Sequence, residues 1–90
     1  MAYRVEVAPA AEREIKRLPL PIQTQIIRRI DKLVDDPRPH GVEKIAGFDD
    51  TYRIRSGDYR ILYTINNREL LVLVVKIGDR KEVYRRLPKR

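Results

Sequence analysis

Hydrophobic and polar positions alternate at the start of the chain and then change to a helical spacing. Residues 3–7 alternate apolar and polar side chains, which is typical of a strand with one buried face. From residue 9 to 18 the apolar positions fall at helical spacing, and Pro9 suits the first helical position because no amide hydrogen is needed there. A broader apolar stripe over residues 21–35 predicts a longer helix that Pro37 ends. We expect these helices to form an antiparallel hairpin packed on a sheet.

The second half of the chain predicts mostly strands. Residues 36–50 contain prolines and glycines, follow directly on Asp35 and end in a second acidic pair, Asp49-Asp50, a composition typical of a loop. Strands are expected at 51–55, 59–65 and 70–75, and the last of these is so uniformly apolar that it indicates burial on both faces.

The end of the chain predicts a further short helix. Asp79 and Glu82 have the spacing of a helix cap, Pro88 would end the helix, and Gly78 would let the chain turn out of the preceding strand. The expected fold class is α+β. It has an N-terminal strand, an antiparallel two-helix hairpin on a small, mostly antiparallel sheet, and a short C-terminal helix, all in one domain over residues 1–90.

A tight turn at Gly57-Asp58 sets the register of the second predicted hairpin. Glycine at the first central position is the type II′ pattern, which suits the twist of paired strands. The turn would pair Arg55 with Arg60 and Ile54 with Ile61, whereas a slip of one residue would force Arg60 into the core. One face then carries Arg53, Arg55 and Arg60, and the other is apolar or aromatic. The residues expected on that other face are Tyr52, Ile54, Ile61, Tyr63 and Ile65.

Positive charge is concentrated in the second half of the chain. The net charge is +7, and residues 1–50 hold nine basic and nine acidic side chains, against eleven and four in residues 51–90. Such asymmetry indicates a polyanionic partner, with nucleic acid ahead of an acidic protein or a lipid surface. Arginine dominates, which favours phosphate recognition because its planar group can pair with two phosphate oxygens. Further candidate contacts follow the last strand: Arg80, Lys81, Tyr84, Arg85 and Arg86.

Two interpretations of the three hairpin arginines stay open at this point. An Arg55–Arg60 pair places like charges opposite each other, which destabilises a sheet, and a bound phosphate would offset that cost. Alternatively, the arginines form a solvated outer face and pair with Asp49, Asp50 or Asp58.

Several function classes are disfavoured by composition. The chain has no cysteine, which suits a reducing cytoplasm and leaves no thiolate metal site. The N-terminus carries charges where a signal peptide needs an apolar stretch, and no apolar run approaches the roughly 18 residues of a membrane span. His40, the single histidine, falls in the predicted loop, and the acidic pairs there have no histidine beside them. We therefore expect a cytoplasmic protein with no membrane, metal or cofactor requirement.

Residues 52–63 and 76–84, together with the helix opening at 10–15 and the two-helix element, resemble the RelE/ParE superfamily of toxins. This resemblance covers nearly the whole chain. It implies a type II toxin that is silenced by a RelB-like antitoxin, and for RelE-type members a metal-independent endoribonuclease. Such a toxin cleaves messenger RNA on the ribosome by attack of the ribose 2′-OH on the adjacent phosphate.

The resemblance also implies roles for individual residues. Arg53 and Arg55 stand on the nucleophile side, Arg60 at the phosphate, Arg80 on the leaving-group side, and Tyr84 where the substrate nucleotide is positioned. Lys81, Arg85, Arg86 and Tyr59 are further candidates for RNA binding, Tyr59 because it lies near the turn while Tyr52 and Tyr63 are expected in the core.

The proton acceptor for this reaction is not identified by sequence. A guanidinium is almost never neutral, so arginine is a poor base. Relatives place lysine, glutamate or histidine at positions that here hold Arg53, Arg55 and Asp79. Asp79 could serve, although a capping role is the simpler interpretation. Two other functions stay open: a ParE-like inhibitor of DNA gyrase without nuclease activity, and a non-catalytic RNA-binding remnant.

Overall fold

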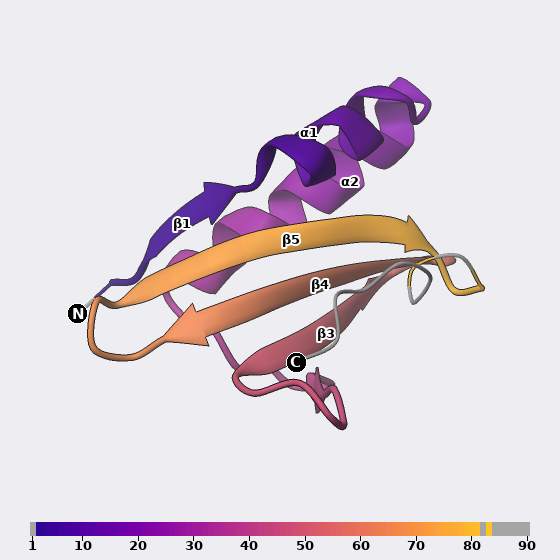
Figure 1. Ribbon diagram of the computed structural model, residues 1–90. Coiled ribbons are helices and arrows are strands. Elements are labelled where there is room, and N and C mark those ends of the chain that lie inside the picture. The colour runs from indigo at the N-terminus through magenta and orange to yellow at the C-terminus, as the bar shows by residue number, and fades with distance from the viewer. Residues whose placement is uncertain (1, 82, 84–90) are drawn as a thin grey trace.

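The computed structural model describes residues 2–81 and 83, which form two helices and a five-stranded sheet (Figure 1). The elements in chain order are β1 (Arg4–Val7), α1 (Pro9–Lys16), α2 (Leu20–Asp31), the 3₁₀ turn η1 (Lys32–Val34), β2 (Glu43–Lys44), β3 (Thr51–Ser56), β4 (Tyr59–Asn66) and β5 (Leu71–Asp79). The predicted order of strand, two helices and three strands is confirmed. The short strand β2 was not predicted and lies in the segment that was interpreted as a loop.

The sheet has the strand order β1-β5-β4-β3-β2, and only β1 and β5 run parallel. Both helices lie on the same side of it, with α1 against β5 and α2 against β3 (Figure 1). The α+β architecture with a mostly antiparallel sheet is therefore confirmed. None of the helices in the described chain has the length and hydrophobicity needed to cross a membrane.

The second helix is shorter than predicted at its C-terminal end. It starts at Leu20, with Pro19 as its cap residue, and ends at Asp31 rather than near residue 35. The chain then tightens into η1, where Asp35 donates its amide hydrogen to the Lys32 carbonyl. This 3₁₀ turn still buries Leu33 completely. The apolar stripe of α2 therefore continues into η1, although the chain is no longer an α-helix there.

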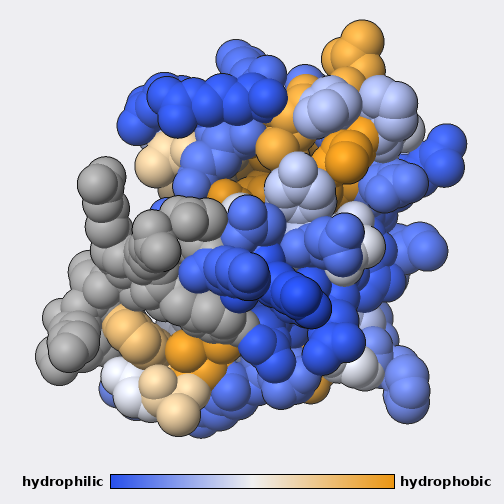
Figure 2. All heavy atoms as spheres, turned by 90° about the vertical axis from the view of Figure 1, so that its right-hand side faces the viewer, coloured by the Kyte–Doolittle hydropathy of each residue, from blue (hydrophilic) through white to orange (hydrophobic). Residues whose placement is uncertain are grey.

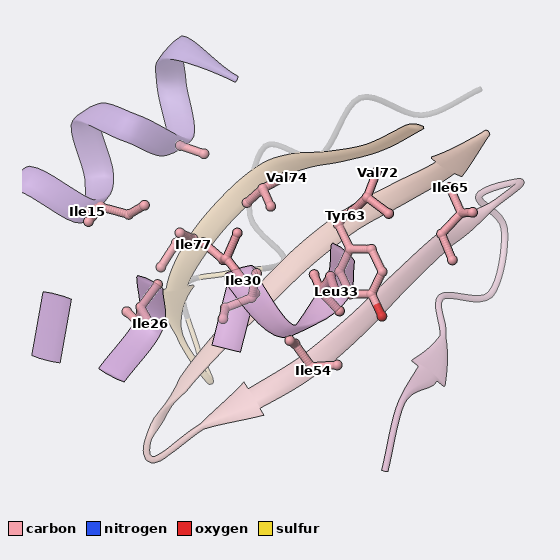
Figure 3. Close-up of a cluster of buried hydrophobic side chains, with 12 residues drawn as sticks. Ile15, Ile26, Ile30, Leu33, Ile54, Tyr63, Ile65, Val72, Val74 and Ile77 are labelled. Atoms are coloured by element: carbon pink, nitrogen blue, oxygen red, sulfur yellow. The ribbon is translucent and has the colours of Figure 1, made fainter. Parts of the chain in front are cut away.

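The core lies between the helices and the sheet and contains apolar side chains from both layers (Figure 3). Its central aromatic residue is Tyr63, which is fully buried and stacks on Tyr52 with ring centroids 6.1 Å apart. The Tyr63 hydroxyl donates a hydrogen bond to the Pro37 carbonyl at 2.7 Å, and burial raises the pKa of Tyr63. The prediction that Tyr52 and Tyr63 belong to the core is confirmed.

The predicted register of the β3–β4 hairpin is confirmed at each pair. Arg55 lies opposite Arg60, Ile54 opposite Ile61 and Arg53 opposite Leu62. Gly57 has a φ of 60°, and Asp58 is not among the residues with positive φ, which is the type II′ pattern.

The β5 strand departs from prediction in its length and its burial. It runs to Asp79 instead of ending at residue 75, and a bulge shifts the pairing so that Leu62 faces Lys76 while Tyr63 faces Val74. The extra residue brings Ile77 into the core. Burial on both faces was wrong: Val72 and Val74 are fully buried, whereas residues 71, 73 and 75 are only partly covered because neither α1 nor α2 packs on their side.

The expected role of Gly78 was also wrong, because this residue lies within β5 and does not turn the chain out of the sheet. A Cβ atom at this position would lie 3.2 Å from the Cα atom of Val83. Glycine is thus required by the close approach of a second backbone. The predicted terminal helix falls mostly outside the described residues, of which 80, 81 and 83 are in turns.

Candidate functional site

The face of the sheet away from the helices carries the predicted arginines. Side chains alternate along a strand, and Ile54, Ile61 and Tyr63 point to the helices, so Arg53, Arg55 and Arg60 point the other way. We call this side, on which neither α1 nor α2 packs, the uncovered face, and these three residues the arginine cluster. Figure 2 views the end of the sheet where the β3–β4 turn lies, and hydrophilic side chains cover most of its middle.

Arg53 is paired with a glutamate that the sequence did not indicate. Strand β2 places Glu43 directly beside Arg53, and the Arg53 Nη2 atom lies 2.6 Å from Glu43 Oε2. The Arg53 side chain is 21% exposed and that of Glu43 is 54% exposed. Arg53 therefore pairs with a carboxylate of the neighbouring strand, which was not among the three aspartates considered from the sequence.

The charges of all three arginines of the cluster affect the ionisation of Glu43. Its pKa is lowered, chiefly by the hydrogen bond from Arg53 and by that residue's charge, with smaller contributions from Arg55 and Arg60. A carboxylate thus stands within the field of the cluster and stays ionised at neutral pH.

Arg60 lies closer to the backbone than predicted. It is only 9% exposed, and its Nη1 atom donates to the carbonyls of Gly57 at 3.3 Å and Tyr59 at 3.1 Å. The side chain is off the helix-covered core, as expected, but it also holds the turn of the hairpin. These contacts fix the position of the guanidinium beside the turn.

Arg55 is the exposed member of the cluster. Its backbone carbonyl accepts a hydrogen bond from Arg29 Nε of α2 at 3.0 Å. Arg29 thereby satisfies an edge carbonyl of β3 at a position that β2 does not reach. No described hydrogen bond or ion pair engages its side chain. The Arg55 guanidinium is therefore available to an incoming anion.

The end of β5 brings two further basic residues to the same end of the sheet. The Arg80 amide donates to the Asp58 carbonyl at 3.1 Å, which fixes Arg80 beside the β3–β4 turn. The Lys81 amide donates to Asp79 Oδ1 at 2.9 Å, so Asp79 holds a turn, in keeping with the capping interpretation. Both basic side chains are exposed.

A glutamate of α1 supports this part of β5. The pairing of β1 with β5 ends at Val74, and beyond it Glu14 accepts the Ile77 amide hydrogen at 2.9 Å and contacts Lys76 Nζ at 3.3 Å. The Glu14 carboxylate thus binds the edge of β5 where β1 no longer reaches it. It keeps the end of β5 in place, and with it the backbone of Arg80.

Tyr59 does not lie with the arginine cluster. It is partly buried and packs against the hydrophobic core, on the same face as Ile61 and Tyr63. Strand alternation turns it away from Arg60, so any contact of Tyr59 with RNA would be made apart from the arginine cluster. His40 is exposed in the loop before β2. Tyr84, Arg85 and Arg86 lie outside the described residues.

The cluster has the chemistry of an anion site. Three guanidinium groups on adjacent strands can pair with phosphate oxygens in a fixed geometry and stabilise negative charge that develops on them. No group of three or more acidic or histidine side chains that could hold a metal is found among residues 2–81 and 83.

The proteins that this chain resembles are toxins of type II toxin-antitoxin systems and their relatives. Residues 5–84 match the family model of the ParE toxin of the type II toxin-antitoxin system parDE. The mRNA interferase toxin RelE of Escherichia coli K12 is 30% identical over 94 residues, which cover 100% of this chain and 98% of the relative. Toxin RelG of Mycobacterium tuberculosis is 28% identical over 87 residues, or 96% of this chain and 100% of the relative.

Solved structures agree with this assignment. The fold is similar to that in the archaeal RelE-RelB complex from Pyrococcus horikoshii, with a TM-score of 0.80 and 28% identity over 92% of this chain and 100% of that chain. The intact Escherichia coli RelBE toxin-antitoxin complex gives a TM-score of 0.75 and 26% identity over 87% and 96% of the two chains. The chain therefore belongs to the RelE/ParE superfamily of toxins of type II toxin-antitoxin systems.

Proposed function

We propose that this toxin is an mRNA interferase, a ribosome-dependent endoribonuclease that cleaves messenger RNA without a metal ion at the chemical step. Its relatives in Escherichia coli and Shigella flexneri are named mRNA interferases. The observation that carries the proposal is the register of β3 and β4, which gathers the arginine cluster on the face away from α1 and α2.

The reaction is an attack of the ribose 2′-oxygen on the adjacent phosphorus. The 2′-O–P bond forms as the P–O5′ bond breaks, which leaves a 2′,3′-cyclic phosphate and a 5′-hydroxyl. Arg60 binds the scissile phosphate, because its guanidinium is held by carbonyls of the turn and needs little reorganisation. Arg53 and Arg55 stabilise the nucleophile side, and Arg80 lies toward the leaving group.

Residues near the end of the sequence would bind the rest of the substrate. Tyr84 would stack on a base of the substrate, while Lys81, Arg85 and Arg86 bind RNA phosphates. We further propose that residues 1–90 form one toxin domain and act in the cytoplasm, where ribosomes are found. Structures of relatives hold RelE with RelB, so we infer a RelB-like antitoxin as the partner.

A second candidate function rests on the family model, whose description is that of a ParE toxin. A ParE-like inhibitor of DNA gyrase would have the same fold without nuclease activity. It would not require the arginine cluster, so substitution of these arginines separates the two functions.

The deciding experiment is a toeprinting assay on ribosomes that carry a defined mRNA. We expect a cut in the mRNA at the ribosomal decoding site, and none when the nucleotide before the cut lacks its 2′-hydroxyl. A supercoiling assay with DNA gyrase runs in parallel. Inhibition of gyrase together with intact mRNA would refute the proposed activity and favour the second candidate.

The metal independence is tested in the same assay. Ribosomes need magnesium for their own structure, so we replace it with exchange-inert cobalt hexammine, which cannot coordinate the substrate directly. Cleavage should continue. Cleavage restored only by a metal that binds oxygen ligands directly would contradict this part of the proposal.

A further inference from the structure

The arginine cluster lacks a group that could accept a proton, and Glu43 is a carboxylate placed beside it. Attack by the ribose 2′-oxygen requires removal of its proton. Arginine cannot accept it, because the guanidinium stays charged. Among the described residues on the uncovered face, Glu43 is held by strand pairing directly beside Arg53.

The geometry of the ion pair leaves part of the carboxylate free. Arg53 engages Oε2 of Glu43, whereas Oε1 accepts no hydrogen bond from the described part of the chain. The glutamate side chain is 54% exposed, so a substrate can reach it. One oxygen is therefore anchored and the other is open to the uncovered face.

From this arrangement we infer that Glu43 is the proton acceptor of the cleavage reaction. Glu43 Oε1 takes the proton of the 2′-hydroxyl while the 2′-oxygen bonds to phosphorus. The electron pair of the breaking P–O5′ bond stays on the 5′-oxygen, which takes a proton from water. Glu43 then returns its proton to solvent. This inference rests on the proposed function and assigns the residue that the cluster itself cannot supply.

The surrounding charges set the basicity of Glu43. In the free protein Arg53 lowers its pKa most, and Arg55 and Arg60 add to the effect, which makes the carboxylate a weak base. A phosphate bound to Arg55 and Arg60 would offset their charge and raise the pKa toward its usual range. Glu43 is therefore a better acceptor with substrate bound than without it.

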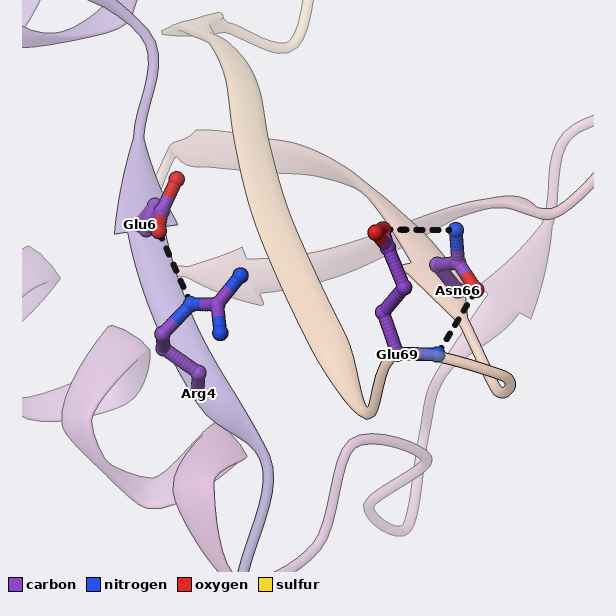
Figure 4. A network of polar contacts seen from close by, with 4 residues as sticks. All are labelled: Arg4, Glu6, Asn66 and Glu69. Carbon is purple, nitrogen blue, oxygen red and sulfur yellow. Dashed lines mark hydrogen bonds and ion pairs between the residues drawn. The ribbon is translucent and has the colours of Figure 1, made fainter.

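The test compares wild type, Glu43→Gln and Glu6→Gln in single-turnover cleavage on programmed ribosomes. Glu6 is the matched control, because it is also exposed, points away from the core and pairs with an arginine, Arg4, at 2.9 Å (Figure 4). Both substitutions remove one negative charge. We expect Glu43→Gln to cleave about 10²- to 10⁴-fold more slowly, the usual loss when a general base is removed, and Glu6→Gln to match wild type.

Dependence on pH separates proton acceptance from simple positioning. Between about pH 6 and 9 the wild-type rate should be nearly flat, because its base is already ionised. Without the base the reaction relies on hydroxide, so the logarithm of the Glu43→Gln rate should rise by about one per pH unit. Affinity for ribosomes carrying a 2′-deoxy mRNA should be unchanged or higher.

Three results would overturn the assignment of Glu43. The first is a wild-type rate in Glu43→Gln, and the second is a faster rate, which would mean that Glu43 only competes with RNA for Arg53. The third is a slower rate with the flat wild-type pH profile, which would make it a positioning residue. A wild-type protein that cleaves nothing would instead refute the proposed function itself.

Discussion

The two faces of the sheet are built from alternate residues of the same strands, yet their environments differ. On the helix-covered face, Ile54, Ile61 and Tyr63 are buried to within 1% of full coverage in one apolar cluster. On the uncovered face the same strands carry arginines that face one another across the hairpin. Burial of apolar area stabilises the first arrangement, whereas like charges oppose the second. We therefore propose that the first face carries stability and the second carries the catalytic activity.

The contrast is not absolute, because the uncovered face also contains buried side chains. Leu62 and Val83 are fully buried outside the main core cluster, and Arg60 is nearly so. We therefore expect Arg60 to contribute both to stability and to activity. Substitutions on each face should reveal how far stability and activity separate.

The largest effect is expected from Arg60→Ala. Loss of one fixed donor to the phosphate should lower cleavage by about 10²- to 10³-fold. The lost bonds to Gly57 and Tyr59 should also cost about 1–3 kcal/mol of unfolding free energy, since a charged donor is removed from two carbonyls. Cleavage rates are measured under conditions where urea titration shows both proteins to be folded.

The matched control for Arg60 is Arg68→Ala, which removes one exposed arginine at the far end of the sheet. It should keep nearly the wild-type rate. Equal losses in Arg60→Ala and Arg68→Ala would mean that total charge matters and that the cluster has no special role.

Next in size is Tyr63→Phe, on the helix-covered face. The substitution leaves the Pro37 carbonyl without its hydrogen bond in a buried place, so unfolding free energy should fall by about 1–3 kcal/mol. Cleavage by the folded protein should not change. Tyr52→Phe is the control, since the Tyr52 hydroxyl only accepts a long 3.5 Å bond from Arg38. A drop in cleavage without a loss of stability in Tyr63→Phe would break the proposed division between the faces.

A smaller effect is expected from Gly78→Ala on the uncovered face. The added methyl group would lie 3.2 Å from the Cα atom and 3.3 Å from the backbone nitrogen of Val83, and neither atom can rotate away. Overpacking should cost about 1–3 kcal/mol, reduced by about 0.4–1 kcal/mol because alanine restricts the unfolded chain. Urea unfolding measures the difference. A variant at least as stable as wild type would show that the approach of the two backbones is loose.

The smallest effect concerns pH and the Glu43–Arg53 pair. The pKa of Glu43 is lowered in the folded protein, chiefly by Arg53, so the pair stabilises the fold above the pKa of the unfolded chain, near 4.5. This stabilisation is lost as the pH falls through the lower folded pKa. Wild type should therefore melt slightly above Glu43→Gln at pH 7, and the two melting temperatures should converge in strong acid. A difference in melting temperature that grows on acidification would contradict a lowered pKa of Glu43 in the folded protein.

The strands and the hairpin register could be predicted because burial decides them strongly. A slip in β3 or β4 would exchange Ile54 and Ile61 with arginines, and the cost of burying charge leaves one arrangement. The direction of the arginine side chains follows from the same argument. The close packing of Arg60 against the turn does not, because its acceptors are backbone carbonyls that have no sequence signature.

Strand β2 and the bulge in β5 could not be predicted for a related reason. Both residues of β2 are exposed, so they leave no pattern of alternating burial, and Glu43 was missed with them. The uniform apolar run of β5 gives no hint that one extra residue shifts the alternation before Ile77. These are also the features that place Glu43 beside Arg53 and bring Arg80 to the hairpin turn.

Arg55→Ala tests the division between the faces most directly. The Arg55 side chain is exposed and its described hydrogen bond is made by its carbonyl, which alanine retains. We expect an unchanged melting temperature and a loss of about tenfold or more in single-turnover cleavage of ribosome-bound mRNA. A folded Arg55→Ala protein that cleaves at the wild-type rate would contradict the claim that the uncovered face carries the activity.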